Sequence, residues 1–320
     1  MTQFCTLADA RARATQMLVE HGTSPQNAAS TARALVAAQA DGLGGHGLSR
    51  LPTYAAQVRC GKVDGLAIPK LEQPRPALLR VDAAHGFAYP AIDLALQFLA
   101  PLARNEGLAA VSLFRSHHCG AMGLHVEHLA RQGLCALMFA NTPAAMAAWG
   151  GQGAIYGTNP IAFAAPVPGA DPIVIDLSLS KVARGNILAA KQKGEKIPSG
   201  WALDANGADT TDAEAALAGT MVPMGDAKGT ALALMVEILA ACLTGAVLSR
   251  DSSSFLDANG PPPGIGQMIL AFDPQVFSGG GYDDRIGALV AALAAATGAR
   301  LPGARRYENR RRAEMEGIQW

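Results

Sequence analysis

The segment from Asp41 to Tyr54 places the strongest constraint on what this sequence folds into. It reads DGLGGHGLSRLPTY, so a single imidazole, His46, stands among glycines, and Arg50 follows four residues later. Glycine backbone bends sharply and lets a ligand approach closely. Ser49 is a typical N-cap residue and predicts a helix over 50–61.

This arrangement puts His46 in the loop that enters the helix and Arg50 at the helix start, so both side chains are expected at the same small volume. A cation at a helix N-terminus favours an anionic ligand. The alternative is a plain helix-entry turn with a solvated arginine and a capping histidine. The segment alone leaves both interpretations open.

Composition excludes several classes of protein. The 320 residues are 50% hydrophobic and 16% charged, which is ample for a large core. Lys and Arg together number 26, as do Asp and Glu, so no basic field favours nucleic acid or an anionic membrane. The longest apolar run, 231–243, contains Glu237 and is too short to span a bilayer.

The cysteines and the N-terminus bear on the compartment. The five cysteines are widely spaced and form no CxxC pair, which is typical of a reducing compartment. The start, MTQFC, has neither the basic nor the apolar region of a signal peptide. We therefore expect a soluble, cytoplasmic protein.

The hydrophobic pattern predicts an α/β fold with a mixed, largely antiparallel sheet surrounded by helices. A Pro- and Gly-rich connection over 62–76 suggests a boundary between a helical domain (1–72, joined by the C-terminal segment 283–320) and a mixed-sheet domain (73–282). The polar stretch 249–266 is expected to be a long loop of the kind that often forms a functional lid. Helices are expected at 7–21, 24–41, 50–61, 90–106, 121–132, 228–243 and 283–297, and strands at 76–81, 107–114, 134–141, 161–165, 173–177 and 268–272.

A second candidate site follows the strand over 107–114. His117, His118, Cys119 and Gly120 stand at a strand-to-helix junction, where backbone N–H groups and imidazoles can face a ligand. A zinc-dependent hydrolase using His117, His118 and Cys119 is the alternative interpretation. Adjacent residues of an extended chain point to opposite sides, however, and no second Cys/His pair stands at zinc-finger spacing, so no metal site is predicted.

A third candidate is Asp176, at the end of an apolar strand, with Ser178 and Ser180 close behind. A carboxylate in that position costs free energy unless it is paired. It could orient an imidazole for acid–base chemistry, or serve only as a cap or ion pair. The serine hydroxyls suit a ribose or phosphate, or an ordinary helix entry.

Two further segments are candidate phosphate contacts. Lys228 and Gly229 open an apolar helix, and Gly303 with Arg305 follows a turn. A Rossmann site at 151–157 (GQGAIYG) is rejected, because the fingerprint needs a helix after the glycines and here TNP and a strand follow.

Together these segments resemble the type-2 malate/L-lactate dehydrogenase family over about residue 5 to the end. The relatives include ureidoglycolate dehydrogenase, 2,3-diketo-L-gulonate reductase, sulfolactate dehydrogenase and Δ1-piperideine-2-carboxylate reductase. One departure is Gly45, which stands before His46 where the family usually has serine. The landmarks are DG at 41–42, HG at 46–47, Arg50, Tyr54, SHH at 116–118, GTNPIAF at 157–163, DLS at 176–178, TTD at 210–212, KG at 228–229, PG at 302–303 and Arg305.

The resemblance implies a homodimeric NAD(P)-dependent oxidoreductase with a non-Rossmann fold. His46 would donate a proton to the oxygen or nitrogen on C2 of the substrate. Asp176 would hold that imidazole, and Arg50 would bind the substrate carboxylate. His118 is a second acid–base candidate. The cofactor would be lined by His118, Gly120, Ile175, Asp176, Leu177, Ser178, Ser180, Lys228, Gly229, Gly303 and Arg305.

The expected substrate is a small 2-hydroxy or 2-oxo acid, such as malate, lactate or sulfolactate, or a cyclic 2-imino acid. Arg305 and Lys228 are suited to a 2′-phosphate, which favours NADP slightly over NAD. A non-catalytic binding protein on the same fold remains a further alternative.

Overall fold

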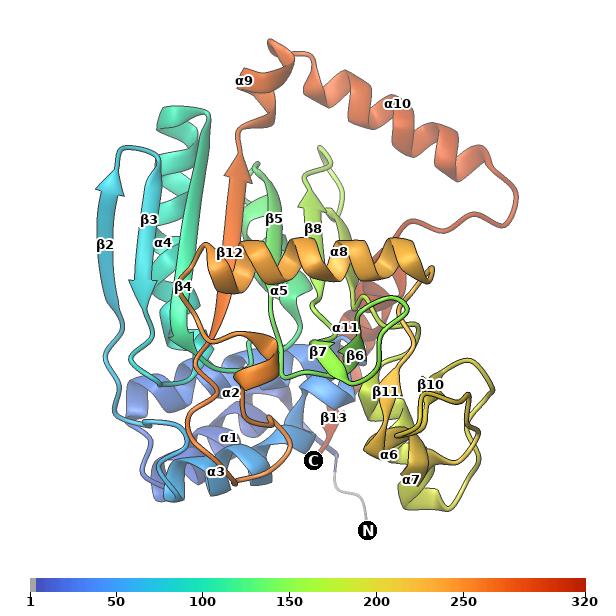
Figure 1. Ribbon diagram of the computed structural model, residues 1–320. Coiled ribbons are helices and arrows are strands. Elements are labelled where there is room, and N and C mark those ends of the chain that lie inside the picture. Colours follow the sequence, from blue (N-terminus) through green and yellow to red (C-terminus); the bar gives the residue numbers. More distant parts are fainter. Residues whose placement is uncertain (1–3) are drawn as a thin grey trace.

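A seven-stranded sheet, in the order β2-β3-β4-β12-β5-β8-β9, forms the centre of the computed structural model (Figure 1). Every neighbouring pair is antiparallel except β3 and β4, which confirms the expected mixed, largely antiparallel sheet. The structure describes residues 4–320, so the first three residues of the predicted N-terminal domain lie outside it. The strands are β2 (Lys70–Arg75), β3 (Leu78–Asp82), β4 (Leu108–Ser116), β5 (Cys135–Ala140), β8 (Ile161–Ala165), β9 (Ile173–Leu177) and β12 (Ile265–Phe272).

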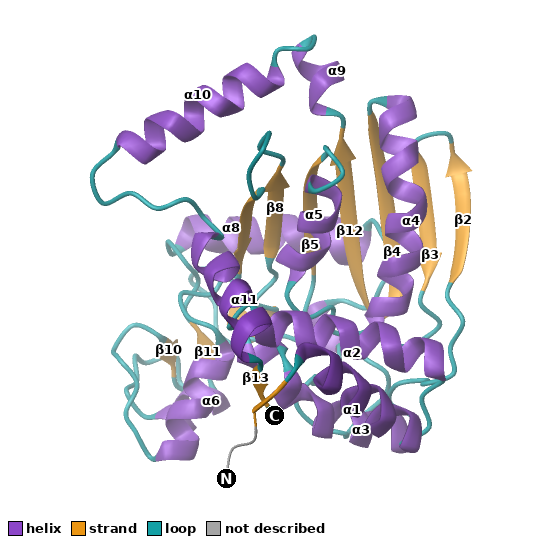
Figure 2. Cartoon of the chain, turned by 180° about the vertical axis from the view of Figure 1, so that it is seen from behind, coloured by secondary structure: helices purple, strands orange, loops and turns teal. Residues whose placement is uncertain are grey.

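Helices cover both faces of this sheet. Figure 2 shows α4 (Ala88–Glu106) and α5 (Met122–Ala130) over one face, and Figure 1 shows α8 (Ala227–Glu237) across the other. The inner side of α4 is buried at Ile92, Leu96, Leu99 and Ala103, which repeat at helical spacing. Because both faces are covered, the central strands read as continuous apolar runs in the sequence.

The strand directions decide where functional residues gather. β12 is antiparallel to both β4 and β5, and β8 is antiparallel to both β5 and β9, so β4, β5 and β9 all end at the same edge of the sheet. The segments that begin at His117, Asn141 and Ser178 therefore leave the sheet together. This edge faces the N-terminal helices (Figure 1).

The N-terminal helices are α1 (Leu7–Glu20), α2 (Pro25–Ala40) and α3 (Leu51–Arg59). Ser24 caps α2 as predicted, because its side chain accepts a hydrogen bond from the Asn27 N–H. The prediction that Ser49 caps the next helix is wrong. Residues 44–46 and 48–50 form two short 3₁₀ turns, and the Ser49 hydroxyl donates back to Gly44 O (2.7 Å).

Two C-terminal segments differ from each other in their surroundings. α11 (Ala304–Glu316) packs beside α2, and β13 (Ile318–Gln319) pairs with β1 (Phe4–Cys5). In contrast, α9 (Pro274–Ser278) and α10 (Tyr282–Ala295) stand beyond the opposite end of the sheet (Figures 1 and 2). The expected joining of 283–320 to the N-terminal helices thus describes the position of α11 but not that of α10.

A smaller lobe combines residues between β5 and β8 with residues after β9. Its four-stranded sheet has the order β10-β11-β6-β7, and Asp212 caps α7 by accepting from two backbone N–H groups. Its elements are β6 (Met146–Ala147), β7 (Ala154–Tyr156), α6 (Arg184–Lys193), β10 (Ala202–Leu203), α7 (Ala213–Ala218) and β11 (Thr220–Met221).

Three local expectations need correction. The stretch 62–76 is not only a connection, because β2 lies within it as an exposed edge strand, and the predicted boundary at 72/73 falls inside that strand. The expected helices end at residue 297, but a further regular helix, α11, follows residue 302. The helix expected over 228–243 changes to a π-helix over Ile238–Cys242. Among residues 4–320, no helix combines the length and apolar character needed to cross a bilayer.

A buried ion network joins α11 to the rest of the protein. Arg310 donates to both carboxylate oxygens of Asp41, at 2.8 and 2.9 Å, and to both of Glu127, at 2.6 and 2.8 Å. The side chains of Asp41 and Glu127 are 0% and 4% exposed. One guanidinium therefore bridges two carboxylates, one at the end of α2 and one on α5.

We predict that Arg310→Met lowers the free energy of unfolding by about 3–5 kcal/mol, because two buried carboxylates lose their shared cation. Urea denaturation measures the change. Arg33→Met is the control: it breaks a pair with Asp93 whose side chains are 56% and 47% exposed, and it should cost under about 1 kcal/mol. Equal costs for the two variants would contradict the network's importance.

Candidate functional site

Two imidazoles from distant parts of the sequence stack at the functional edge of the sheet. The ring centroids of His46 and His118 lie 5.3 Å apart, and the ring planes differ by 15°. His46 ends the first 3₁₀ turn after α2, and His118 follows β4. The structure therefore brings together the two acid–base candidates that the sequence left as alternatives.

Glycines make this approach possible. A Cβ atom on Gly47 would lie 3.1 Å from both Cα and Cβ of Gln39, so a side chain there would push the His46 turn off α2. Gly120 has a φ of +68°, and a Cβ atom there would lie 2.7 Å from the Tyr89 hydroxyl. Both positions thus need glycine for close approach of the backbone.

Burial keeps the imidazoles neutral. Burial lowers the pKa of His46 below its ordinary value, and the positive charge of Arg50 lowers it further. The negative charge of Asp176 acts in the opposite direction. The pKa of His118 is lowered much more, again chiefly by burial. The Nδ1 atom of His46 is enclosed and has no hydrogen-bond partner among the described residues.

Arg50 stands beside this pair as the sequence suggested. Its Nε donates to Gly45 O (2.7 Å), which fixes the guanidinium against the glycine turn. Its terminal nitrogens have no hydrogen bond to the part of the chain that the structure describes. Its charge influences both His46 and His118. The guanidinium is therefore available to an anion next to the imidazoles.

Asp176 lies near the end of β9, and its partners are Arg306 and a backbone amide. Its Oδ2 accepts from Gly123 N (2.8 Å) and from Arg306 Nη2 (3.2 Å). No hydrogen bond joins it to His46, so its effect on that imidazole is through its charge. The expectation that Asp176 holds the His46 ring directly is thus not met in this geometry.

Of the two adjacent arginines after Gly303, both of which suit a cofactor phosphate by sequence, only Arg305 was expected to line the cofactor, and the pairing of Arg306 with Asp176 was not predicted. Arg305 is exposed, whereas the Arg306 side chain is 10% exposed and also lies 3.6 Å from Asp41. The signal available was helical spacing, since Arg306 and Arg310 are four residues apart and share the inner side of α11. A Cβ atom on Gly123 would lie 2.1 Å from Arg306 Nη1, so glycine is needed to seat this guanidinium.

The loop over 252–264 covers the imidazoles, as a lid would. The Phe255 ring lies 5.2 Å from the His118 ring and 5.5 Å from the His117 ring. Lys62, whose side chain is fully buried, donates to the carbonyls of Ser254 (2.7 Å) and Asp257 (3.2 Å). The sequence predicted the loop, but nothing in the pattern around Lys62 indicated that a buried ammonium anchors it.

The predicted cofactor residues on β9 and α8 lie side by side. Ser178 and Ser180 follow β9, and their hydroxyl oxygens are 2.7 Å apart. The backbone N–H of Met224 donates to Leu179 O (2.8 Å), which holds the start of α8 against this segment. Lys228 is exposed in the first turn of α8, and Gly229 packs so tightly that a Cβ atom would lie 1.9 Å from Met224 O.

Gly303 brings a second helix N-terminus to the same strand. Its φ is +89°, and a Cβ atom there would lie 3.2 Å from Val174 O on β9. The starts of α8 and α11 thus both lie beside β9 and its continuation, on which Ile175, Asp176 and Leu177 also lie. Two helix N-termini, exposed cations and serine hydroxyls form a donor set suited to phosphate and ribose groups.

The zinc-hydrolase alternative finds no support. Within residues 4–320, no three His, Cys, Asp or Glu side chains are placed to hold a metal ion. His117 is enclosed by the rings of Tyr54, Phe87 and Phe255, and burial raises the pKa of the Cys119 thiol to about 12. These groups are therefore poor zinc ligands.

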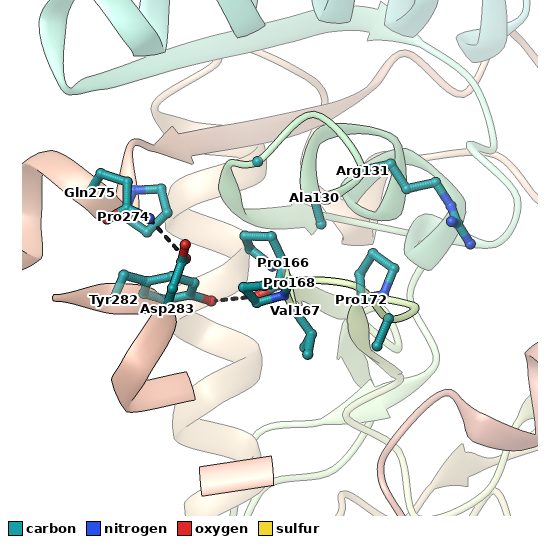
Figure 3. A pocket seen from close by; sticks show the side chains of 12 residues that line it. Ala130, Arg131, Pro166, Val167, Pro168, Pro172, Pro274, Gln275, Tyr282 and Asp283 are labelled. Carbon is teal, nitrogen blue, oxygen red and sulfur yellow. Dashed lines mark hydrogen bonds between the residues drawn. The ribbon is translucent and has the colours of Figure 1, made fainter. Parts of the chain in front are cut away.

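A separate cavity of about 480 Å³ lies at the opposite end of the sheet (Figure 3). Its wall includes Pro166, Pro168 and Pro172 from the turn between β8 and β9 and Pro274 at the start of α9, and the Tyr282 hydroxyl donates to Pro166 O (3.0 Å). No imidazole lines it. The cavity is thus distinct from the site built on His46.

The site combines paired neutral imidazoles, a guanidinium available to an anion, and a phosphate-suited segment, without a Rossmann unit. This set suits an enzyme that acts on a small organic anion. The chain belongs to the malate/L-lactate dehydrogenase family, whose model matches residues 5–320. The predictions of this family and of a dehydrogenase or reductase are therefore confirmed.

Among curated relatives, the chain is 52% identical to the (2R)-3-sulfolactate dehydrogenase (NADP(+)) of Chromohalobacter salexigens, over 97% of this chain and 93% of that protein. It is 40% identical to the Δ(1)-pyrroline-2-carboxylate reductase of Ancylobacter novellus, over 98% and 93%. The crystal structure of the Δ1-piperideine-2-carboxylate reductase from Pseudomonas syringae superposes with a TM-score of 0.94 at 38% identity, covering 99% of this chain and 96% of that one.

The buried imidazoles make a prediction about stability and pH. The pKa of His117 is lowered to about 3, so below about pH 6.5 the unfolded chain takes up a proton that the folded protein does not. Stability from this group is therefore complete above that pH and declines as the pH falls toward the folded pKa. Replacing His117 by Leu should reduce the slope of unfolding free energy against pH, between pH 6 and 5, by about 1 kcal/mol per pH unit. Urea denaturation at several pH values measures it, and identical slopes would contradict the assignment.

Proposed function

We propose that this protein is an NADP-dependent oxidoreductase that transfers a hydride between the nicotinamide and C2 of a small 2-hydroxy or 2-oxo acid. The observation that carries the proposal is the stacked pair His46–His118 with Arg50 beside it. Reducing a C=O or C=N bond beside a carboxylate needs a cation for the carboxylate and a proton donor at the reacting atom. These three side chains supply both.

Arg50 binds the substrate carboxylate, and the turn that holds its Nε aligns the guanidinium. His46 donates the proton to the C2 oxygen during reduction and takes it back during oxidation. Its lowered pKa makes it a ready donor once protonated. Asp176 stabilises the protonated imidazole through its charge, while Arg306 holds the carboxylate in place. The nicotinamide, when bound, supplies or accepts the hydride.

The cofactor residues fit an anionic dinucleotide. Gly303 and Gly229 allow the starts of α11 and α8 to lie against β9 and its continuation, and Ser178 offers a hydroxyl there. Lys228 and Arg305 are exposed cations at those helix starts and suit a 2′-phosphate. The relative at 52% identity carries NADP(+) in its name, which supports the same cofactor here.

The relatives also order the candidate substrates. We place a 3-sulfolactate-like 2-hydroxy acid first, because that relative is 52% identical, and a cyclic 2-imino acid second, because the pyrroline-2-carboxylate reductases are near 40%. We further propose that the protein works in the cytoplasm, which agrees with its five unpaired cysteines.

We propose that two copies of the chain associate through α8 and the residues that follow it, up to residue 249. The outer side of this segment has no charged residue between Lys228 and Arg250, apart from the buried Glu237. An isologous contact places this face against the same face of a second copy, which also lacks charge.

Light scattering should give twice the 32.9 kDa chain mass. Leu234→Glu should give a single-chain mass, whereas the control Leu66→Glu, outside this face, should not. A single-chain mass for the unmodified protein would overturn this assignment. The exposed apolar side chains there are Leu232, Leu234, Met235, Ile238, Leu243, Val247 and Leu248.

The function is tested by a panel that follows nicotinamide absorbance. Sulfolactate, malate, lactate and ureidoglycolate are offered with NADP⁺ or NAD⁺, and Δ1-piperideine-2-carboxylate and Δ1-pyrroline-2-carboxylate with NADPH or NADH. We expect turnover with NADP(H), highest with sulfolactate. Nucleotide binding without turnover of any of these acids would instead favour a binding protein.

His46→Ala should lower kcat by a factor of about 100 to 10,000, the range typical of general acid–base catalysis, and leave the Kd for NADP⁺ nearly unchanged. Arg50→Ala should act mainly on KM, because it removes the group that binds the carboxylate. Steady-state assays of nicotinamide absorbance measure kcat and KM, and fluorescence titration with the nucleotide measures the Kd for NADP⁺. Near-normal turnover of the His46 variant would transfer the acid role to His118.

A further inference from the structure

Behind the imidazole pair lies a chain of buried hydroxyl groups that no part of the proposed mechanism uses. The Tyr54 hydroxyl lies 2.6 Å from His118 Nδ1 and 3.2 Å from the Tyr89 hydroxyl. Tyr54 is 0% exposed and Tyr89 is 2% exposed. Tyr54 is on α3, and Tyr89 is in the first turn of α4.

The protons of this chain can be placed by counting donors and acceptors. Each tyrosine hydroxyl has one proton to donate, and a neutral imidazole has one donor and one acceptor nitrogen. Tyr54 is the only described partner of the Tyr89 hydroxyl. If His118 Nδ1 donated to Tyr54, only one of the two tyrosine hydroxyl protons could be donated within this chain of groups, and the proton of the other buried hydroxyl would have no acceptor among the described residues.

The opposite direction satisfies every group. Tyr89 donates to Tyr54, Tyr54 donates to His118 Nδ1, and both hydroxyl protons have acceptors. The ring proton of His118 is then on Nε2. Nε2 makes no hydrogen bond with the described residues. His46 Nδ1 is among the buried polar atoms that have no partner, but His118 Nε2 is not.

We propose that Tyr54 is a positioning residue that holds His118 as the neutral Nε2–H tautomer, so that His118 donates a hydrogen bond to the substrate's C2 oxygen while His46 alone transfers the proton. This division of roles rests on the proposed function. The stacking of the rings supports these two roles, because both rings can then face the same C2 oxygen, His118 as a hydrogen-bond donor and His46 as the proton donor. Burial lowers the pKa of His118 well below its ordinary value, and a neutral His118 leaves His46 free to carry positive charge without repulsion from its neighbour.

The tautomer can be measured without any assay of activity. In protein labelled with ¹⁵N-histidine, the two ring nitrogens of His118 should give a pyridine-like shift for Nδ1 and a pyrrole-like shift for Nε2, assigned by comparison with His118→Gln. Tyr54→Phe should convert this pattern to a mixture of tautomers. Tyr282→Phe, which removes a tyrosine hydroxyl at the far end of the sheet, should leave it unchanged. A pyrrole-like Nδ1 in the unmodified protein would overturn the proposal, whatever the enzyme's activity.

Kinetics separate a hydrogen-bond donor from an acid. Tyr54→Phe should lower kcat/KM by about 10- to 100-fold, the effect seen when the hydrogen-bond partner of a metal-ligating histidine is removed, without changing the Kd for NADP⁺. His118→Gln keeps an N–H donor and should retain at least ten times the kcat of His118→Leu. Equal loss in the two His118 variants would show that His118 transfers a proton, and would overturn the proposal while leaving the enzyme class intact.

Discussion

The proposed chemistry depends most on the contact between the His46 and His118 rings. Neither residue can reach the other through local structure, since one ends a glycine turn after α2 and the other follows β4. Their approach requires the edge of the sheet to pack on the N-terminal helices, with Gly47 and Gly120 giving the space. Burial in that junction then lowers both pKa values, and the same packing that builds the core sets the protonation state of the site.

The C-terminal helix α11 stabilises this junction from the other side. Arg310 ties α2 to α5 through two buried carboxylates, and Arg306 contacts Asp41 and Asp176. One helix thus connects the turn that carries His46 with the strand that carries Asp176. Because the start of α11 also lies against β9 at Gly303, a nucleotide bound there would be in contact with the same helix that holds these carboxylates.

Much of the fold could be predicted from the sequence where apolar patterning is strong. The strands β8 and β9 were expected at 161–165 and 173–177 and are found there, because both are short apolar runs between turn residues. β2 was missed because it is an exposed edge strand with a proline, which has no alternating apolar signal. α11 was missed because its inner side is held by ion pairs and not by an apolar stripe.

The site was harder to predict in its details than in its outline. His46, Arg50 and His118 stand out as chemically unusual residues among glycines, and they do lie together. The hydrogen-bond partners of these residues could not be predicted from the sequence. Arg305 and Arg306, for example, differ only in which side of α11 they occupy. Tyr54 and Lys62 act through contacts with residues far away in the sequence, to His118 and to the loop that carries Phe255. Such contacts exist only after folding.

The central claim is that the two imidazoles and Arg50 surround one reacting carbon. A crystal structure with NADP⁺ and a non-reacting 2-oxo acid analogue such as oxamate tests it most directly. The account predicts the carboxylate on the Arg50 guanidinium and the C2 oxygen within hydrogen-bond distance of both His46 and His118, with the nicotinamide on the other face of the ligand. An analogue bound away from all three side chains, for instance in the cavity of Figure 3, would contradict it.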